Sequence, residues 1–431
     1  MGIFEEEYEC MDCDQLHSLQ EKRLKDIVKR CYKNSIFYKK SFDRANISPD
    51  DIKTLDDLKL LPFMSKMDFA ENYPFGLFCC PISDVKRFHA SSGTTSNPKI
   101  VGFTENDMKI WRNTSSRVLS AMGLKPGDKI QNAFYYGMFT GGFCFHDGAE
   151  NLGLSIIPIS AGNTERQVSF IQDLKSDILV CTPSYALYIG EIMKSKGILP
   201  EDISLSKGLF AGEPLTLETQ KMINELFGIE SFNDYGIAEI MPGLAFECSA
   251  HSGLHINEDH FIPEIINPDT GEVLPMGEEG ELVFSCVTKE ALPLLRYRTG
   301  DITSLSREKC SCGRTLVKML PPRGRTDDML IIRGVNVFPT QIEATLIEMG
   351  IAPNFKVIVN RDISMDTIEV QFEAPYENRE HDIAYKNSIE ARVNKKLKSR
   401  LGLEVITTMT PYKSIERVIG KSRRVIDNRG I

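Results

Sequence analysis

The sequence predicts an α/β protein with a large N-terminal domain and a small α+β C-terminal domain. Its 431 residues exceed the ~250–300 residues at which single hydrophobic cores stop growing. Between residues 85 and 325, short β-rich runs alternate with helical stretches, which is typical of a mixed or parallel sheet covered by helices. The segment LPPRGRTDD combines prolines, a glycine and charges, so we place the domains at 1–326 and 327–431.

The individual elements follow from hydrophobic periodicity. Residues 15–45 carry apolar side chains at helical spacing, which predicts one amphipathic helix. The central region predicts strands at KIVGFT, LSIIPIS, DILVCTP and GELVFSCV, and a helix at DMKIWRNTSSRVLSAMG. Beyond the boundary we expect helices at 340–349 and 383–401, with strands near KVIVN, TIEVQFE and EVITT.

Charge and cysteine content narrow the class of protein. The chain has 51 basic and 60 acidic residues, a net charge of −9, which argues against nucleic acid as the main partner. No apolar run approaches the ~20 residues that cross a bilayer, and the N-terminal MGIFEEEYECMDCD is acidic where a secretory signal would be basic. We therefore expect a cytoplasmic protein without a membrane partner, in which the 11 cysteines are thiols or metal ligands.

A hydroxyl-rich turn is the sharpest local signal. It follows the strand-like VKRFHA and reads Ser91-Ser92-Gly93-Thr94-Thr95-Ser96-Asn97-Pro98-Lys99. Gly93 lets backbone N–H groups turn toward an anion, and the hydroxyls and Lys99 add donors and positive charge. From composition alone the segment is either a phosphate-binding loop or a solvated Ser/Thr turn.

Two further clusters suggest binding sites. Aromatic residues and glycines crowd the segment FYYGMFTGGFCF, which suits a flat ring or ordinary core packing, and we name Tyr136, Phe139 and Gly142 as candidate lining residues. A second cluster could form a tetrahedral zinc site with three sulfurs and one nitrogen. Its candidate ligands are Cys248, His251 or His255, Cys310 and Cys312. Four protein ligands leave no open position for substrate, so this site would be structural.

In their order along the chain, the motifs resemble the adenylate-forming superfamily and, within it, the phenylacetate–CoA ligases. The hydroxyl-rich turn is similar to the phosphate motif of that superfamily, and the aromatic segment to its acyl pocket. Further similar segments are Ala211-Gly212-Glu213-Pro214-Leu215, Asn233-Asp234-Tyr235-Gly236-Ile237-Ala238-Glu239, Arg298-Thr299-Gly300-Asp301, Gly324-Arg325-Thr326-Asp327-Asp328 and Lys421.

The resemblance implies a role for each of these positions. Lys421 would be the catalytic lysine, Glu239 the Mg²⁺ ligand, Asp327 the hinge of a mobile C-terminal domain, and Gly334 part of the loop that lines the pantetheine tunnel. The resemblance also favours His255 over His251 as the zinc ligand. The implied nucleotide contacts are Ser92, Gly93, Thr94, Thr95, Lys99, Gly212, Glu213, Pro214, Asn233, Asp234, Tyr235, Gly236, Asp301 and Arg325.

The implied activity is an AMP-forming aryl-acid–CoA ligase. It would convert phenylacetate, ATP and CoA into phenylacetyl-CoA, AMP and pyrophosphate through an acyl-adenylate, with Mg²⁺ and a structural Zn²⁺, in phenylacetate catabolism. Relatives are often homodimers, which extends the expectation to this chain. The alternatives are another aryl acid such as indoleacetate, an adenylyltransferase without CoA transfer, and a silent nucleotide-binding or zinc scaffold. Lys99, Glu239, Asp301 and Lys421 argue against the last of these.

Overall fold

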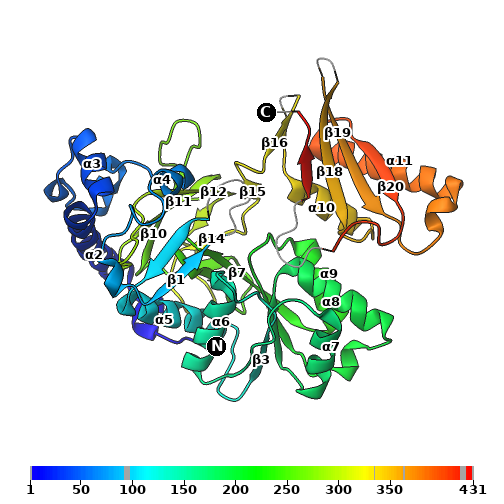
Figure 1. Cartoon of the computed structure of the whole chain (residues 1–431), viewed down its shortest axis with the longest axis horizontal. Helices are drawn as coiled ribbons and strands as arrows, with labels where there is room; N and C mark the ends of the chain where they lie inside the picture. The colour runs from blue at the N-terminus through cyan, green and yellow to red at the C-terminus, as the bar shows by residue number, and fades with distance from the viewer. Residues whose placement is uncertain (1, 92–97, 334, 363–364, 418–423, 430–431) are drawn as a thin grey trace.

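A computed structural model describes residues 2–91, 98–333, 335–362, 365–417 and 424–429. The chain forms a large N-terminal lobe and a smaller C-terminal lobe (Figure 1). The buried apolar residues of the C-terminal lobe form their own cluster, which begins at Leu330 and is separate from the two clusters of the N-terminal lobe. The cores therefore lie on either side of residue 327, and the boundary itself stays a prediction.

A nine-stranded mixed sheet organises the N-terminal lobe, in the order β13-β14-β9-β8-β7-β6-β5-β3-β4. The five strands at one end are parallel to one another, and from β7 onward the pairing is antiparallel. The strands are β3 (Lys129–Asn132), β4 (Ser155–Ile157), β5 (Ile178–Cys181), β6 (Lys207–Phe210), β7 (Glu230–Ile237), β8 (Met241–Glu247), β9 (Leu254–Ile256), β13 (Leu305–Ser306) and β14 (Lys318–Met319).

Helices cover both faces of the parallel half, because successive side chains of a buried strand point to opposite faces. On β5, Val180 belongs to the core shared with α5 (Glu105–Ala121) and α6 (Thr140–Leu152). Its neighbour Leu179 belongs to the core on the other face. That second core is formed with α7 (Thr164–Asp173), α8 (Pro183–Ser195) and α9 (Leu217–Phe227).

Smaller sheets and N-terminal helices complete this lobe. A four-stranded sheet runs β10-β11-β12-β15, and β1 pairs with β2. These strands are β1 (Arg87–Ala90), β2 (Ile100–Phe103), β10 (Phe261–Ile266), β11 (Gly280–Cys286), β12 (Tyr297–Thr303) and β15 (Gly324–Arg325). The helices are α1 (Glu6–Glu9), α2 (Cys13–Asn34), α3 (Ile36–Arg44), α4 (Lys66–Glu71) and the 3₁₀ turns η1 (Pro49–Asp51), η2 (Leu55–Leu60), η3 (Ile82–Asp84) and η4 (Pro200–Asp202).

The single helix predicted over residues 15–45 is wrong, because the chain breaks at Ser35 into α2 and α3. Ser35 is extended, with φ −121° and ψ 125°, and serine is a weak helix former whose hydroxyl competes with the backbone ladder. The break redirects Tyr38 and Phe42 into the core, where both are buried. The apolar periodicity of 15–45 is real, but two short helices satisfy it as well as one long helix.

The C-terminal lobe is the small α+β unit that the sequence predicts. Its sheet runs β20-β19-β18-β21, and the predicted helices and strands fall within a few residues of the observed ones. The elements are β16 (Leu330–Ile332), β17 (Val335–Val337), α10 (Pro339–Glu348), β18 (Phe355–Asp362), β19 (Met365–Glu373), η5 (Arg379–His381), α11 (Ile383–Leu401), β20 (Ile406–Thr410) and β21 (Val425–Asp427).

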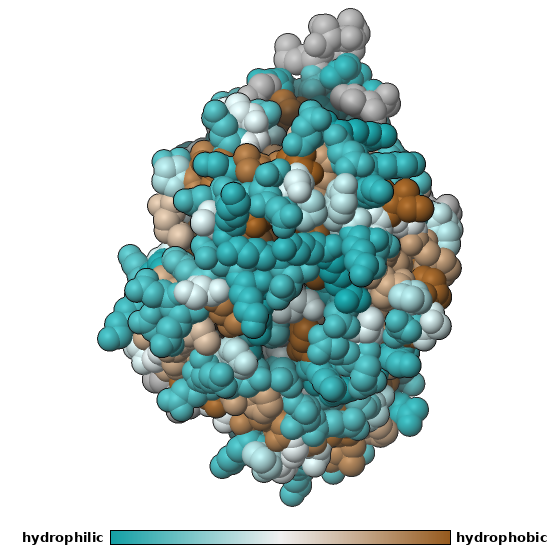
Figure 2. Space-filling model, turned by 90° about the vertical axis from the view of Figure 1, so that its left-hand side faces the viewer, coloured by the Kyte–Doolittle hydropathy of each residue, from teal (hydrophilic) through white to brown (hydrophobic). Residues whose placement is uncertain are grey.

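The surface is polar over the N-terminal helices. Figure 2 shows mostly hydrophilic side chains on this side of the molecule, with apolar residues scattered among them. Within the described ranges, the search for a helix with enough length and hydropathy to span a bilayer finds none.

A buried ion pair ties α5 to the loop before β10. Arg117 donates to both carboxylate oxygens of Asp259, at 2.7 and 3.0 Å, and the two side chains are 1% and 0% exposed. A third hydrogen bond joins Arg117 to Asn257 at 3.0 Å. Removal of one partner from such a pair leaves an uncompensated buried charge.

We therefore expect Asp259→Ala to lower the free energy of unfolding by ~3–5 kcal/mol. Urea denaturation followed by circular dichroism would measure the loss. Asp269→Ala is the matched control, since Asp269 is exposed in a turn and should change stability by less than ~0.5 kcal/mol. Equal effects for the two substitutions would contradict a special role of the buried pair.

Candidate active site

The carboxyl ends of the parallel strands gather several predicted site residues at one edge of the sheet, where ligands bind in open α/β sheets. Phe134 follows β3, Thr182 follows β5 and Gly212 follows β6. Gly212 has φ +82° and approaches both other residues, with its Cβ position 3.8 Å from Thr182 and 3.9 Å from Phe134. Next to it, the Glu213 carboxylate accepts a 3.1 Å hydrogen bond from the Ser184 backbone N–H. This edge therefore combines an apolar wall with a fixed polar loop.

A hydrogen-bonded chain links three of the predicted nucleotide contacts. The Tyr235 hydroxyl donates to Asp301 at 2.6 Å, and Arg325 donates to the other carboxylate oxygen of Asp301 at 3.0 Å. Asp301 and Arg325 are direct partners in the β12–β15 ladder. Burial, followed by the charge of Asp301, raises the pKa of Tyr235 well above its ordinary value, so this hydroxyl remains a donor. A carboxylate in this position can accept hydrogen bonds.

Lys99 and Glu239 form a salt bridge although they are 140 residues apart in sequence. The Glu239 side chain is 7% exposed and that of Lys99 is 25% exposed. Buried Lys289 fixes the backbone beneath them, because its ammonium donates to the carbonyls of Glu239 and Ile240 at 3.0 and 2.7 Å. Burial lowers the pKa of Lys289 to about 8. A carboxylate and an ammonium at the nucleotide edge suit a bound metal–phosphate complex.

The predicted hinge residue Asp327 is held from both sides. Arg325 donates to it at 2.8 and 3.2 Å, and Lys66 of α4 donates at 2.9 Å. Burial acts to raise the pKa of Asp327, but these two cations outweigh it and lower the pKa to about 2. Arg325 therefore connects the segment between the lobes with Asp301.

The predicted acyl-pocket residues lie where β3 leads into α6. The Tyr136 hydroxyl contacts Asn132 at 3.0 Å and His146 at 3.1 Å, whereas Phe139 is 43% exposed. Gly142 leaves no space for a side chain, since its Cβ position is 2.6 Å from the carbonyl oxygen of Tyr135. The glycine therefore lets the entering loop fold tightly onto the first turn of α6.

Asp234 and Tyr235 are neighbours on β7 and point to opposite faces of the sheet. Tyr235 reaches Asp301, whereas Asp234 is 5% exposed and its Oδ1 has no hydrogen-bond partner among the described residues. Burial alone raises the pKa of the Asp234 carboxyl to about 8. The other predicted residues of this motif are not isolated in this way. Asn233 donates its backbone N–H to the Glu247 carboxylate at 2.9 Å, and Gly236 is exposed. Pro214, a predicted residue of the loop after β6, is also exposed.

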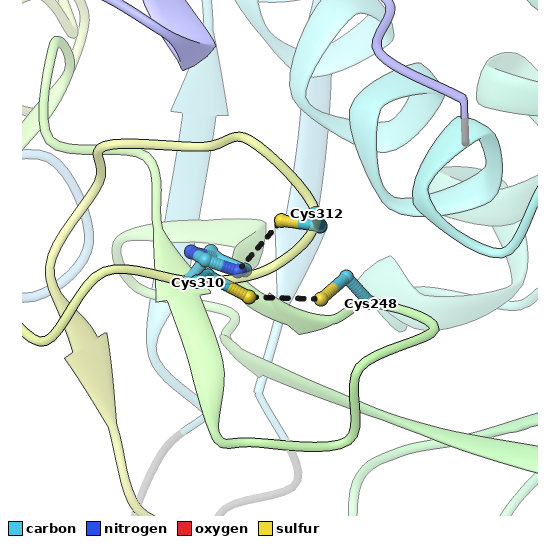
Figure 3. A group of neighbouring side chains, drawn as sticks. Cys248, Cys310 and Cys312 are labelled. Atoms are coloured by element: carbon cyan, nitrogen blue, oxygen red, sulfur yellow. Dashed lines mark hydrogen bonds between the residues drawn. The ribbon is translucent and has the colours of Figure 1, made fainter.

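The four candidate metal ligands come together, with one ligand atom from each lying within 4.8 Å of all the others. The sulfurs of Cys248 and Cys310 are 3.7 Å apart, and the sulfur of Cys312 is 3.4 Å from Nε2 of His255 (Figure 3). Nδ1 of His255 faces the Leu316 carbonyl at 3.4 Å, which leaves Nε2 for a metal.

His251 lies outside this cluster. Its ring nitrogens contact Glu230 at 3.0 Å and Glu247 at 3.1 Å. Of the two histidines considered from the sequence, the structure thus brings His255 to the cysteines. Ser92, Gly93, Thr94, Thr95, Gly334 and Lys421 lie outside the described residues.

Comparison with known proteins identifies the class. The family model described as AMP-binding enzyme matches residues 84–287, and the one described as AMP-binding enzyme C-terminal domain matches 334–429. The crystal structure of 2-hydroxyisobutyryl-CoA ligase in the postadenylation state, in complex with 2-HIB-AMP, has a TM-score of 0.92 and 26% identity over 98% of this chain and 92% of that chain. The fold and the site define an adenylate-forming enzyme.

A curated relative narrows the class to one family. Phenylacetate-coenzyme A ligase from Thermus thermophilus is 43% identical over 443 residues, which cover 99% of this chain and 100% of that protein. The chain belongs to the phenylacetate-coenzyme A ligase family. The α/β fold and the acid–thiol ligase class expected from the motifs are confirmed.

The same comparison bears on the arrangement of the lobes. The structure of 2-hydroxyisobutyryl-CoA ligase with 2-HIB-AMP and CoA in the thioesterification state has a TM-score of 0.73, with 26% identity over the same 98% of this chain and 92% of that chain. Because coverage and identity equal those of the postadenylation structure, the lower score reflects conformation. The lobes of this chain are arranged more closely as in the postadenylation structure.

Sequence reasoning missed Lys66, Lys289 and the isolation of Asp234. Lys66 and Lys289 lie in ordinary charged segments, MSKMDF and VTKEAL, and their partners are 261 and about 50 residues away. For Asp234 a signal was present in the sequence. It lies two residues after Phe232, and residues two apart on a strand share a face, so its carboxylate is expected to face the core as Phe232 does.

The raised pKa of Asp234 has a consequence for pH-dependent stability. The pKa of Asp234 in the folded protein is about 8, above the ordinary value of 3.8. Between these two pH values the Asp234 carboxyl binds more protons in the folded protein than in the unfolded chain. Its contribution to the free energy of unfolding therefore falls as pH rises. Asparagine does not titrate, so Asp234→Asn lacks this loss of stability. The Tm of Asp234→Asn minus the Tm of the wild type should therefore increase from about pH 5 to about pH 8 and then level off. Differential scanning calorimetry would measure it, with Asp269→Asn as control, and parallel curves for Asp234→Asn and wild type would contradict the shift.

Proposed function

We propose that the chain is an AMP-forming aryl-acid–CoA ligase that converts phenylacetate, ATP and CoA into phenylacetyl-CoA, AMP and pyrophosphate. The observation that carries the proposal is that the segment from Tyr235 to Glu239 contacts two other predicted site residues, Asp301 through Tyr235 and Lys99 through Glu239. The near full-length similarity to a phenylacetate-coenzyme A ligase supports the choice of acid.

The first half-reaction requires two anions, the carboxylate and the α-phosphate, to approach each other, so charge must be neutralised and both groups aligned. Lys99 would neutralise phosphate charge, and Glu239 would hold Mg²⁺, which supplies further neutralisation. Tyr235 would stack on adenine while Asp301 accepts from the ribose hydroxyls. The segment Ser92–Thr95 would add donors to the phosphates.

The second half-reaction needs the thiol of CoA to reach the adenylate carbonyl. We propose that the lobe from residue 327 turns about Asp327, which exchanges Lys421 for the loop around Gly334. The 2.9 Å contact of Lys66 with Asp327 supports a hinge at this point, because it anchors the pivot to the large lobe. The cysteines support a reducing, cytoplasmic location, since none of the 11 is in a disulfide.

Magnesium-dependent ATP–pyrophosphate exchange over a panel of aryl acids tests this function. We expect exchange with arylacetates and, after CoA is added, formation of the thioester. Exchange without thioester formation would instead identify an adenylyltransferase. Exchange with no aryl acid would contradict the proposed function.

Lys421→Ala separates the two half-reactions. We expect pyrophosphate release to fall at least ~100-fold, because a charge that stabilises the transition state is lost. Thioester formation from preformed acyl-adenylate should remain largely intact. Lys413→Ala is the matched control, since Lys413 is an exposed lysine of the same basic tail and should leave both steps unchanged. Equal loss of both half-reactions in Lys421→Ala would contradict the division of labour.

We further propose that Cys248, His255, Cys310 and Cys312 bind a structural zinc ion. Three sulfurs and one imidazole nitrogen within 4.8 Å of one another are a donor set and a spacing that zinc prefers. The ion would join the loop between β8 and β9 to the loop between β13 and β14, which packs against the N-terminal segment through Arg314 and Glu9.

Metal analysis of protein purified without chelators should find about one zinc ion per chain. Cys310→Ser should lower both the zinc content and the Tm, because a structural site contributes to folding. Cys181→Ala is the control, since Cys181 is a buried cysteine outside the cluster and should keep its zinc. A wild-type protein without zinc would refute the site.

A further inference from the structure

Asp234 is a buried carboxyl group with no described partner, at the centre of the enzyme. It is 5% exposed, and Oδ1 has no hydrogen-bond partner among the described residues. No charged group contributes to its pKa, which burial alone raises. Burial of a polar group without a hydrogen bond costs ~1–3 kcal/mol. A cost of this size is typical of a group kept for a ligand.

The position of Asp234 on β7 places it on the face covered by α5 and α6. Phe232, two residues earlier and therefore on the same face, belongs to the core that contains Cys144 and Phe145 of α6. The charge of Asp234 also raises the pKa of the Cys144 thiol, so the two groups are close. In the β7–β8 ladder, the residue opposite Asp234 is Phe246.

This location is the acyl side of the site. The helix α6, which packs on this face, carries the predicted acyl-pocket residue Gly142, and the loop that leads into it carries Tyr136 and Phe139. Tyr235, the next residue along β7, faces Asp301 on the nucleotide side. An acid activated between these two sides would meet aromatic and apolar walls, with Asp234 as the single polar group contributed by β7 on the acyl side.

We infer that Asp234 binds a hydroxyl group of the acyl substrate, so that the preferred acid is a hydroxyaryl acid. This inference rests on the proposed function. A hydroxyl brings one donor, which Oδ1 of Asp234 can accept, whereas an ammonium brings three donors. At neutral pH the carboxyl is largely protonated, and a neutral carboxyl pairs with a neutral hydroxyl without leaving a charge in the pocket.

The test compares phenylacetate with its 2-, 3- and 4-hydroxy derivatives and the corresponding aminophenylacetates. The measurement is kcat/KM for pyrophosphate release by the full chain. We expect the wild type to prefer one hydroxy isomer over phenylacetate by at least ~10-fold, because a site built for a hydroxyl disfavours the analogue without it. Asp234→Leu should abolish that preference, because leucine offers no acceptor for the hydroxyl.

Two further variants make the result decisive. Asp234→Asn keeps the shape and an acceptor oxygen, so it should fold if Asp234→Leu does not, and it should retain only part of the preference. Asp269→Leu, at an exposed site, should keep the wild-type ratio.

Each remaining outcome counts against the inference. Three results would contradict the inference but not the proposed function. The wild type could show no preference for a hydroxy isomer, it could prefer an amino isomer, or the Asp234 variants could keep the wild-type ratio of kcat/KM between the hydroxy isomer and phenylacetate. If no aryl acid is activated at all, the proposed function falls as well.

Discussion

The change of strand direction at β7 is the constraint on which the rest of the site depends. β7 pairs in parallel with β6 and antiparallel with β8, so it is the last strand whose carboxyl end lies at the ligand-binding edge of the parallel half. The chain must turn sharply after it to pair back, and this turn carries Glu239 to Lys99. Because side chains alternate along β7, Tyr235 reaches Asp301 on one face while Asp234 lies on the other, so one strand would serve both the proposed nucleotide side and the proposed acyl side.

Two buried acids show how this protein separates structure from function. Asp259 lies between two cations, since it accepts from Arg117 at 2.7 and 3.0 Å and Arg23 is 3.6 Å away. Asp234 is similarly buried but has no cation among its described neighbours. A paired buried charge is expensive to disturb, so Asp259 fixes α5 on the sheet. A buried carboxyl group without a hydrogen bond weakens the fold, and the proposed contact with a substrate hydroxyl would offset that cost.

The sequence predicted the features that depend on local pattern. The C-terminal helix expected at 383–401 is observed as Ile383–Leu401, because its apolar spacing and its charges agree with one element. At Ser35 the local pattern failed, since apolar spacing alone does not register a break that keeps the same face buried. The motif order predicted Glu239, Tyr235 and Asp301 as site residues, but their contacts depend on the way the fold brings distant segments together.

Arg325 joins two parts of the mechanism that the motifs treat separately. It donates to Asp301 on the nucleotide side and to Asp327 at the junction of the lobes. A turn of the C-terminal lobe that moves Asp327 must therefore lengthen one of these hydrogen bonds or carry Arg325 away from Asp301. Either change alters the charge next to Asp301, the carboxylate proposed to bind ribose, because the cation now at 3.0 Å would move away. If the lobe turns as proposed, the affinity for the nucleotide and the position of the small lobe would be coupled through one guanidinium group.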